Sequence, residues 1–216
     1  MPRNVAPANI TSAKDLVQYN VVDSEPVEAN AAPGYIERYI HSEIYRRFPG
    51  VRSVIHSHAS AVLPYSISGA KTPVFDVAKY YKSDATRDLL IRDRHLGESL
   101  AKYFHAEDAD VVETETLELD HSVVLMRGHG YTVAAQGIEE CVYRAIYTRD
   151  NAAVQTESLG LLAAAYNLSY GPRVDIDYLR PDELSAAGKI AMTGWARAWG
   201  LWVREVEAIG LYVHER

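Results

Sequence analysis

The chain is poor in the features that mark secreted proteins. It contains one cysteine in 216 residues, so an internal disulfide is excluded, and its first residues lack the apolar core of a signal peptide. We therefore expect a reducing, cytoplasmic setting. Cys141 falls in a helical pattern with no histidine nearby, which favours a small buried hydrophobic residue over a nucleophile.

Long apolar runs and clusters of positive charge are also missing. No segment reaches the length of about 20 apolar residues that a membrane-spanning helix needs, so we expect no membrane partner. The formal net charge is −7 and there is no run of lysine and arginine, which argues against a nucleic-acid partner. A hydrophobic content of 48% is ordinary for a globular protein. We expect one domain spanning residues 1–216.

Hydrophobic periodicity predicts helices and strands that alternate along the chain. Strands are expected at residues 17–22, 51–61, 73–76, 89–92, 123–126 and 131–133. Helices are expected at residues 12–16, before Pro49, around 96–104, from Ile138 to about Tyr166, and after Arg180. The acidic interval 107–120 is expected to be a loop or a solvated edge. The tryptophans of the last helix, at three-to-four spacing, favour core or subunit contacts over a ligand box.

Two histidines one residue apart lie in the expected strand 51–61. Side chains alternate between the faces of a strand, so His56 and His58 are predicted to point the same way. Neutral imidazole is a common ligand of zinc and related metals. A half-exposed strand with its polar residues outward explains the same pattern, and an isolated His-x-His fixes no geometry.

Further candidate residues occur on both sides of this pair. Glu37 and His41 lie one turn apart on the preceding helix, a spacing that is also typical of a solvated face. His41 is a candidate substrate-binding residue. His129 has a glycine on each side at the end of a core strand, a good position for a third ligand and a poor one for packing. Three histidines and an open position are typical of a catalytic zinc-type site.

In this combination the sequence resembles the class II aldolase/adducin family, which has the fuculose-phosphate aldolase-like fold. Segments 37–41, 48–58 and 123–130 carry the resemblance. It extends from about Ile10 to the end of the helix that begins at Ile138. The resemblance implies an α/β fold, a three-layer α/β/α sandwich around a mainly antiparallel sheet, assembled as a homotetramer with active sites between subunits.

The resemblance also implies roles for individual residues. His56, His58 and His129 correspond to the ligands of a divalent metal, with Zn expected first and Mn, Co or Fe as alternatives. Glu37 corresponds to the catalytic carboxylate. The implied enzyme is a metal-dependent carbon–carbon lyase acting on a small-molecule substrate, and both aldol cleavage and decarboxylation would pass through a metal-stabilised enolate.

The sequence departs from the sugar-phosphate aldolases at their phosphate-binding segments. It has no Gly-Asn-x-Ser, and residues 10–14 and 35–36 replace the other two. A non-phosphorylated hydroxy acid or hydroxyaromatic acid is therefore expected, which places the chain in the decarboxylase-like branch. Compared with the family pattern, this chain is expected to be shorter at its N-terminus and in the connection between residues 69 and 73.

Two other functions remain as alternatives. One is an aldolase acting on a sugar or sugar phosphate. The other is a non-catalytic, adducin-like interaction domain, although adducin-type domains do not keep the three histidines that this chain has.

Overall fold

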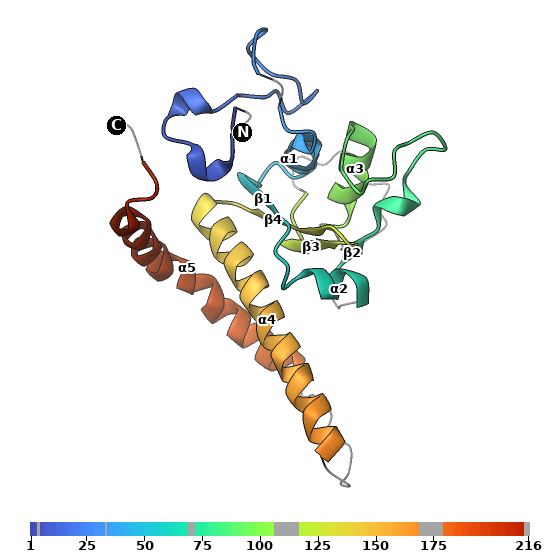
Figure 1. Ribbon diagram of the computed structural model, residues 1–216, viewed down its shortest axis with the longest axis vertical. Helices are drawn as coiled ribbons and strands as arrows, with labels where there is room; N and C mark the ends of the chain where they lie inside the picture. Colours follow the sequence, from blue (N-terminus) through green and yellow to red (C-terminus); the bar gives the residue numbers. More distant parts are fainter. Residues whose placement is uncertain (4, 33, 69–71, 106–116, 169–178, 214–216) are drawn as a thin grey trace.

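The computed structural model describes residues 1–3, 5–32, 34–68, 72–105, 117–168 and 179–213 (Figure 1). Three short 3-10 helices occupy Pro7–Asn9, Ala13–Asp15 and Val77–Lys79. The other elements, in chain order, are α1 (Arg38–Arg47), β1 (Ser53–Ser57), α2 (Leu63–Ser68), β2 (Val74–Phe75), α3 (Arg94–Lys102), β3 (Val123–Met126), β4 (Gly130–Ala135), α4 (Ile138–Leu168) and α5 (Pro181–Ile209).

The strands form one sheet in the order β1-β4-β3-β2. β4 pairs antiparallel with both β1 and β3, whereas β2 pairs parallel with β3. The expectation of a mainly antiparallel sheet is confirmed. The strands predicted at residues 123–126 and 131–133 are confirmed, and they form the β3–β4 hairpin. Its turn contains Gly128 at a φ of 66°, a left-handed conformation that glycine adopts without a steric cost.

Helices cover both faces of this sheet, which confirms the three-layer arrangement. On one face Val54, Val124 and Met126 pack against apolar residues of α1 and α3, including Ile44 and Leu100. On the other face Leu125, Tyr131 and Val133 pack with Val62 and with Cys141 of α4. Cys141 is fully buried, as the sequence predicted. Because His56 is two residues after Val54 on β1, it faces the layer that contains α1.

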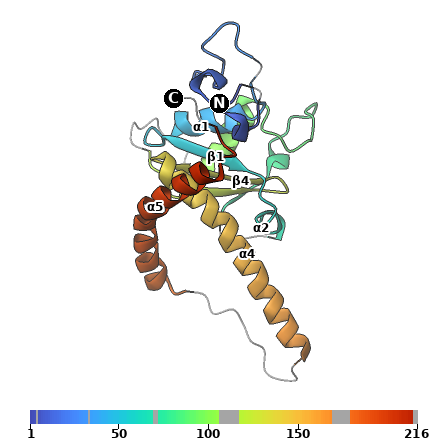
Figure 2. The same ribbon diagram turned by 60° about the vertical axis from the view of Figure 1, so that its left-hand side comes forward.

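The two long helices α4 and α5 confirm the helices predicted from residues 138 and 180. α4 continues far beyond the sheet, and α5 contacts it along part of its length (Figures 1 and 2). Gly171-Pro172, a pair that is expected from the sequence to break the helical pattern between α4 and α5, lies outside the described residues. Trp195, Trp199 and Trp202 are half-buried, and the Trp202 ring lies 6.1 Å from that of Tyr143 on α4. Within the described ranges, no helix is both long and apolar enough to cross a bilayer.

Two predicted strands are wrong. Residues 17–22 form a single isolated bridge, between Tyr19 and Pro26, because no described strand of the sheet runs beside them. Residues 89–92 also form no strand, since Leu89 has a φ of 68° and turns the chain. The strand expected at 51–61 is shorter than predicted and ends at Ser57, with His58 just beyond it.

Other predictions near these segments had mixed outcomes. The sequence reading missed α2, although Pro64 in its first turn is a typical helix signal. The acidic interval 107–120 lies mostly outside the described residues. The single-domain assignment for residues 1–216 stays a prediction.

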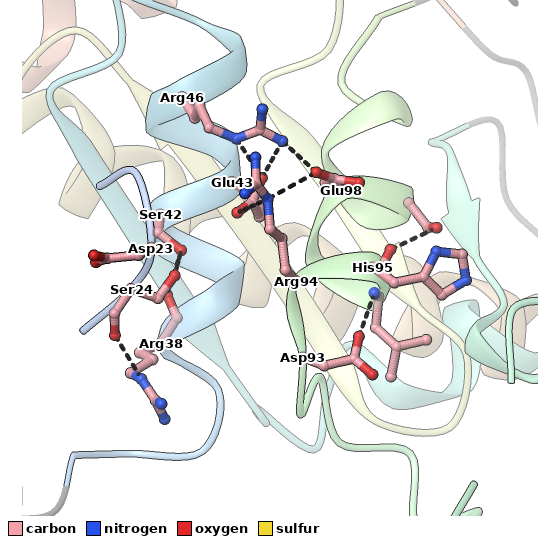
Figure 3. Close-up of polar contacts among 12 residues, drawn as sticks. Asp23, Ser24, Arg38, Ser42, Glu43, Arg46, Asp93, Arg94, His95 and Glu98 are labelled. Atoms are coloured by element: carbon pink, nitrogen blue, oxygen red, sulfur yellow. Dashed lines mark hydrogen bonds and ion pairs between the residues drawn. The ribbon is translucent and has the colours of Figure 1, made fainter. Parts of the chain in front are cut away.

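Polar contacts hold α1 between α3 and the N-terminal segment (Figure 3). The buried carboxylate of Glu43 on α1 pairs with Arg46, 2.5 Å away, and Arg46 also pairs with Glu98 of α3 at 2.5 Å. On the opposite side of α1, the hydroxyl oxygens of Ser24 and Ser42 are 2.5 Å apart. These contacts fix the helix whose N-terminal end carries Glu37.

Close approach of α1 and α3 depends on a glycine. A Cβ at Gly97 would lie 2.6 Å from the Tyr39 carbonyl oxygen, so Gly97→Ala is expected to destabilise the fold by about 1–3 kcal/mol through overpacking. Gly160→Ala is the matched control, because that exposed α4 position has no neighbouring atom within 4 Å and alanine favours the helix. Urea denaturation measures both variants. A Gly97→Ala protein as stable as Gly160→Ala would contradict the prediction.

Candidate metal centre

Four side chains from separate segments converge at one end of the sheet. Glu37 immediately precedes α1, His56 is on β1, His58 follows β1, and His129 is in the β3–β4 turn. Each offers a ligand atom, and these atoms all lie within 4.8 Å of one another. The sheet brings them together, because β1 is paired with β4 and His56 lies opposite Thr132. The structure therefore joins Glu37 and all three predicted histidines in one cluster.

His56 presents Nε2 to the centre of this cluster. Its Nδ1 lies 3.1 Å from the Tyr131 carbonyl oxygen, which can only accept a hydrogen bond, so Nδ1 carries the proton. Nε2 is then unprotonated and available as a ligand. The Nε2 atoms of His56 and His58 are 2.8 Å apart, so both imidazoles point at the same space although His58 lies outside the strand.

His129 is the clearest sign that a ligand belongs here. Both ring nitrogens are buried, and neither has a hydrogen bond of good geometry within the described part of the chain. Buried polar atoms of native proteins are rarely left in this state. Its Nε2 lies 3.5 Å from Glu37 Oε1, and the His56 Nε2 lies 3.6 Å from Glu37 Oε2. Three imidazoles and one carboxylate fit the donor set of a divalent cation.

Burial controls the protonation of these groups. It lowers the pKa of His56 to about 3, with further contributions from His129 and His58. Burial and His58 likewise lower the pKa of His129 to about 4, against an opposing effect of the Leu89 backbone. Neutral imidazoles are the form that binds metal. Burial raises the pKa of the Glu37 carboxyl, although the Ile91 N–H bond opposes this shift.

The metal-free protein is expected to lose stability as the pH falls below 6.5. Burial lowers the pKa of His41 to about 4 and that of His56 to about 3, from 6.5, so the unfolded chain binds more protons across that window. Unfolding then becomes more favourable by up to about 1.4 kcal/mol per pH unit for each group. The raised pKa of Glu37 acts in the opposite sense and reduces the net slope.

Urea midpoints in the presence of a chelator at pH 7 and pH 5 measure this dependence. A His56→Asn variant is expected to show a smaller difference, because asparagine does not titrate. A midpoint that stays constant or rises at pH 5 would contradict the prediction.

A cavity of about 740 Å³ lies beside the cluster. Glu37 and His56 form part of its wall, so the cavity reaches the candidate ligands. His41, one turn after Glu37 on α1, lines the same cavity. The predicted substrate-binding residue therefore shares a cavity wall with Glu37 and His56. The rest of the wall includes three aromatic residues, Tyr19, Tyr35 and Tyr45.

Sequence reasoning missed the surroundings of these residues. The N–H of Ile91 donates to Glu37 Oε1 over 3.2 Å, but residues 89–92 had the pattern of a strand. Every residue except proline has a backbone N–H, so the residue type does not reveal which N–H donates to the site. Tyr19 and Tyr35 come from the irregular N-terminal segment, where no periodicity indicated a shared cavity.

Comparison with known proteins places this geometry in a family. A sequence model described as "Class II Aldolase and Adducin N-terminal domain" matches residues 1–156. The chain is 47% identical over 228 residues to "Decarboxylase tropJ" of Talaromyces stipitatus, an alignment that covers 99% of this chain and 83% of that protein. It is 28% identical over 148 residues to "3,4-dihydroxyphthalate decarboxylase" of Arthrobacter keyseri, covering 63% of this chain and 54% of that protein.

Solved structures agree at the level of the fold. An aldolase II superfamily protein from Pseudomonas syringae superimposes with a TM-score of 0.55 at 18% identity, covering 94% of this chain and 75% of that one. The L-fuculose 1-phosphate aldolase from Glaciozyma antarctica PI12 gives a TM-score of 0.58 at 15% identity, with 94% and 72% covered. With the family match, the shared fold and the grouped histidines, the chain belongs to the class II aldolase and adducin family.

Proposed function

We propose that this chain is a metal-dependent carbon–carbon lyase that decarboxylates a non-phosphorylated hydroxyaromatic acid. The observation that carries the proposal is the convergence of three imidazoles and Glu37 beside a cavity with aromatic walls. The names of two relatives, both decarboxylases, support this reaction over aldol cleavage. The adducin-like alternative would leave without a purpose the buried nitrogens of His129, which make no hydrogen bond of good geometry to the described residues.

His56, His58 and His129 would hold the cation through their Nε2 atoms. Zn²⁺ is the first candidate, since three neutral imidazoles and an open position suit catalytic zinc, and Mn, Co or Fe are alternatives. A bound cation would supply Lewis-acid stabilisation of negative charge that develops on a substrate oxygen. The Tyr131 carbonyl would keep the His56 ring in the required tautomer.

Glu37 would deliver the proton that replaces the lost carboxylate. In decarboxylation the bond between the substrate carbon and its carboxylate carbon breaks, carbon dioxide leaves, and that substrate carbon takes one proton. Burial raises the pKa of Glu37, which increases the fraction of carboxyl able to donate. Its Oε1 accepts the Ile91 N–H, so Oε2 remains for the transferable proton. Solvent would then reprotonate the carboxylate.

The cavity supports an aromatic substrate. Tyr19, Tyr35 and Tyr45 offer flat apolar faces with polar tips, an arrangement that suits a phenolic ring. His41 is neutral near pH 7, since burial lowers its pKa to about 4, and would offer a hydrogen bond to a substrate hydroxyl.

Assembly into a homotetramer is the further expectation for this chain. Large apolar side chains are exposed on both long helices, which supports contact with other subunits. These residues include Val154, Leu159, Leu161, Leu184, Ile190, Leu201 and Ile209. Size-exclusion chromatography with light scattering measures the mass in solution.

Metal reconstitution combined with a substrate screen tests the function. The purified protein is stripped with chelator, incubated with Zn²⁺, Mn²⁺, Co²⁺ or Fe²⁺, and analysed for bound metal. Carbon dioxide release is then measured from 3,4-dihydroxyphthalate and related hydroxybenzoates. One equivalent of metal and metal-dependent release are expected. Failure to retain any of the four metals would overturn the enzyme assignment, and release of an aldehyde without carbon dioxide would favour aldol cleavage.

A further inference from the structure

One short segment contacts both Glu37 and the turn that carries His129. Within residues 88–91, the Ile91 N–H donates to Glu37 Oε1 over 3.2 Å. Two residues earlier, the Leu89 side chain reaches the β3–β4 turn, where its Cδ1 lies 3.7 Å from the position of a Cβ on Gly128.

The segment makes these contacts only in an unusual conformation. Leu89 has a φ of 68°, a left-handed value that bulky residues rarely adopt. With an extended backbone at Leu89, the following residues would run in a different direction. The Ile91 N–H would then move away from the Glu37 carboxylate. Surrounding contacts must therefore hold Leu89 in place.

One contact of this kind comes from Tyr81. Its hydroxyl oxygen accepts a hydrogen bond from the Leu89 N–H over 2.8 Å. Next to it, Asp88 Oδ1 accepts the Leu90 N–H over 3.2 Å, and Asp88 is paired with Arg92. The ring of Tyr81 is half-buried against the core that α1 and α3 share. This packing fixes the position of the hydroxyl group.

We propose that Tyr81 is a positioning residue of the metal centre. Its hydroxyl holds Leu89 in the left-handed conformation, and the segment then fixes Glu37 through the Ile91 N–H and supports the turn that carries His129. Tyr81 is not one of the four clustered residues and is not part of the cavity wall. The inference rests on the proposed function, because it assumes that the histidine cluster binds a metal.

Tyr81→Phe tests the inference by removing one oxygen and keeping the ring. Tyr80→Phe is the matched control, since Tyr80 packs on the same core and its hydroxyl lies 3.2 Å from that of Tyr103. Co²⁺ is the probe: its visible absorption reports ligand geometry, and chelator competition gives its dissociation constant. Tyr81→Phe is expected to weaken Co²⁺ binding about tenfold, as for other supporting residues, and to change the absorption spectrum. Tyr80→Phe is expected to stay within about twofold of the unmodified protein.

A second pair of variants separates positioning from general loosening. Glycine adopts a positive φ without strain, so Tyr81→Phe is expected to cost less in a Leu89→Gly background than in the unmodified protein. Equal costs in the two backgrounds would overturn the tethering role, and so would Co²⁺ constants that are the same for Tyr81→Phe and Tyr80→Phe. Absence of Co²⁺ binding by the unmodified protein would instead overturn the proposed function together with this inference.

Discussion

Replacing His129 with alanine is expected to reduce bound metal to background and to lower turnover by about 10³-fold or more. The substitution removes one of three imidazoles, and the transition-state stabilisation that a metal supplies amounts to several kcal/mol, with each 1.36 kcal/mol worth a factor of ten. Both ring nitrogens of His129 are buried and make no hydrogen bond of good geometry to any described residue, so a ligand role explains them best. Elemental analysis after reconstitution and steady-state kinetics measure the two effects.

His95→Ala is the control for this substitution. His95 is exposed on α3 and its Nε2 lies 3.2 Å from the Tyr80 carbonyl oxygen, outside the cluster. That variant is expected to keep one equivalent of metal and its turnover. A His129→Ala protein that is folded by urea denaturation and still binds one equivalent would remove His129 from the ligand set. His56 and His58 would then need a different partner.

The elements that could be predicted are those whose own residues bury a periodic face. α1, α3 and α4 each present an apolar stripe to the sheet, and the continuous apolar run at residues 123–126 forms β3, the first strand of the β3–β4 hairpin. The segments at residues 17–22 and 89–92 have equally apolar patterns. Residues 17–22 form no strand because no strand of the described sheet runs beside them, and residues 89–92 form none because Leu89 turns the chain. No pattern within a segment reveals whether a partner strand is available.

The candidate site also has residues that could be predicted from the sequence and supporting groups that could not. The three histidines could be singled out because their positions in and beside apolar strands are costly without a function. Glu37 is identified by the resemblance to the family, and the fold brings all four together. Their support could not be predicted, since it consists of backbone groups. The Tyr131 carbonyl orients His56, and the Ile91 N–H holds the Glu37 carboxylate. Almost every residue type has these backbone groups, so the sequence does not reveal which of them contact the site.

Glu37→Gln is expected to keep the metal and to lower kcat by about 10²–10⁴-fold, the usual contribution of a positioned acid or base. Glutamine has nearly the same shape, and its amide oxygen can still accept the Ile91 N–H that now reaches Glu37 Oε1. It cannot carry a transferable proton. Because the change acts on the proton-transfer step, KM is expected to change much less than kcat. Metal stoichiometry, kcat and KM are measured on the same preparation.

The comparison with Glu157→Gln shows whether the loss is specific to position 37. Glu157 is an exposed carboxylate on α4, far along the chain from the cluster, and its substitution is expected to leave kcat unchanged. If Glu37→Gln lost its metal as well as its activity, the carboxylate would be a fourth ligand, which its distances of 3.5 and 3.6 Å to two histidine nitrogens allow. If it retained full turnover while His129→Ala had none, proton transfer would pass to His41, one turn further along α1 on the wall of the same cavity.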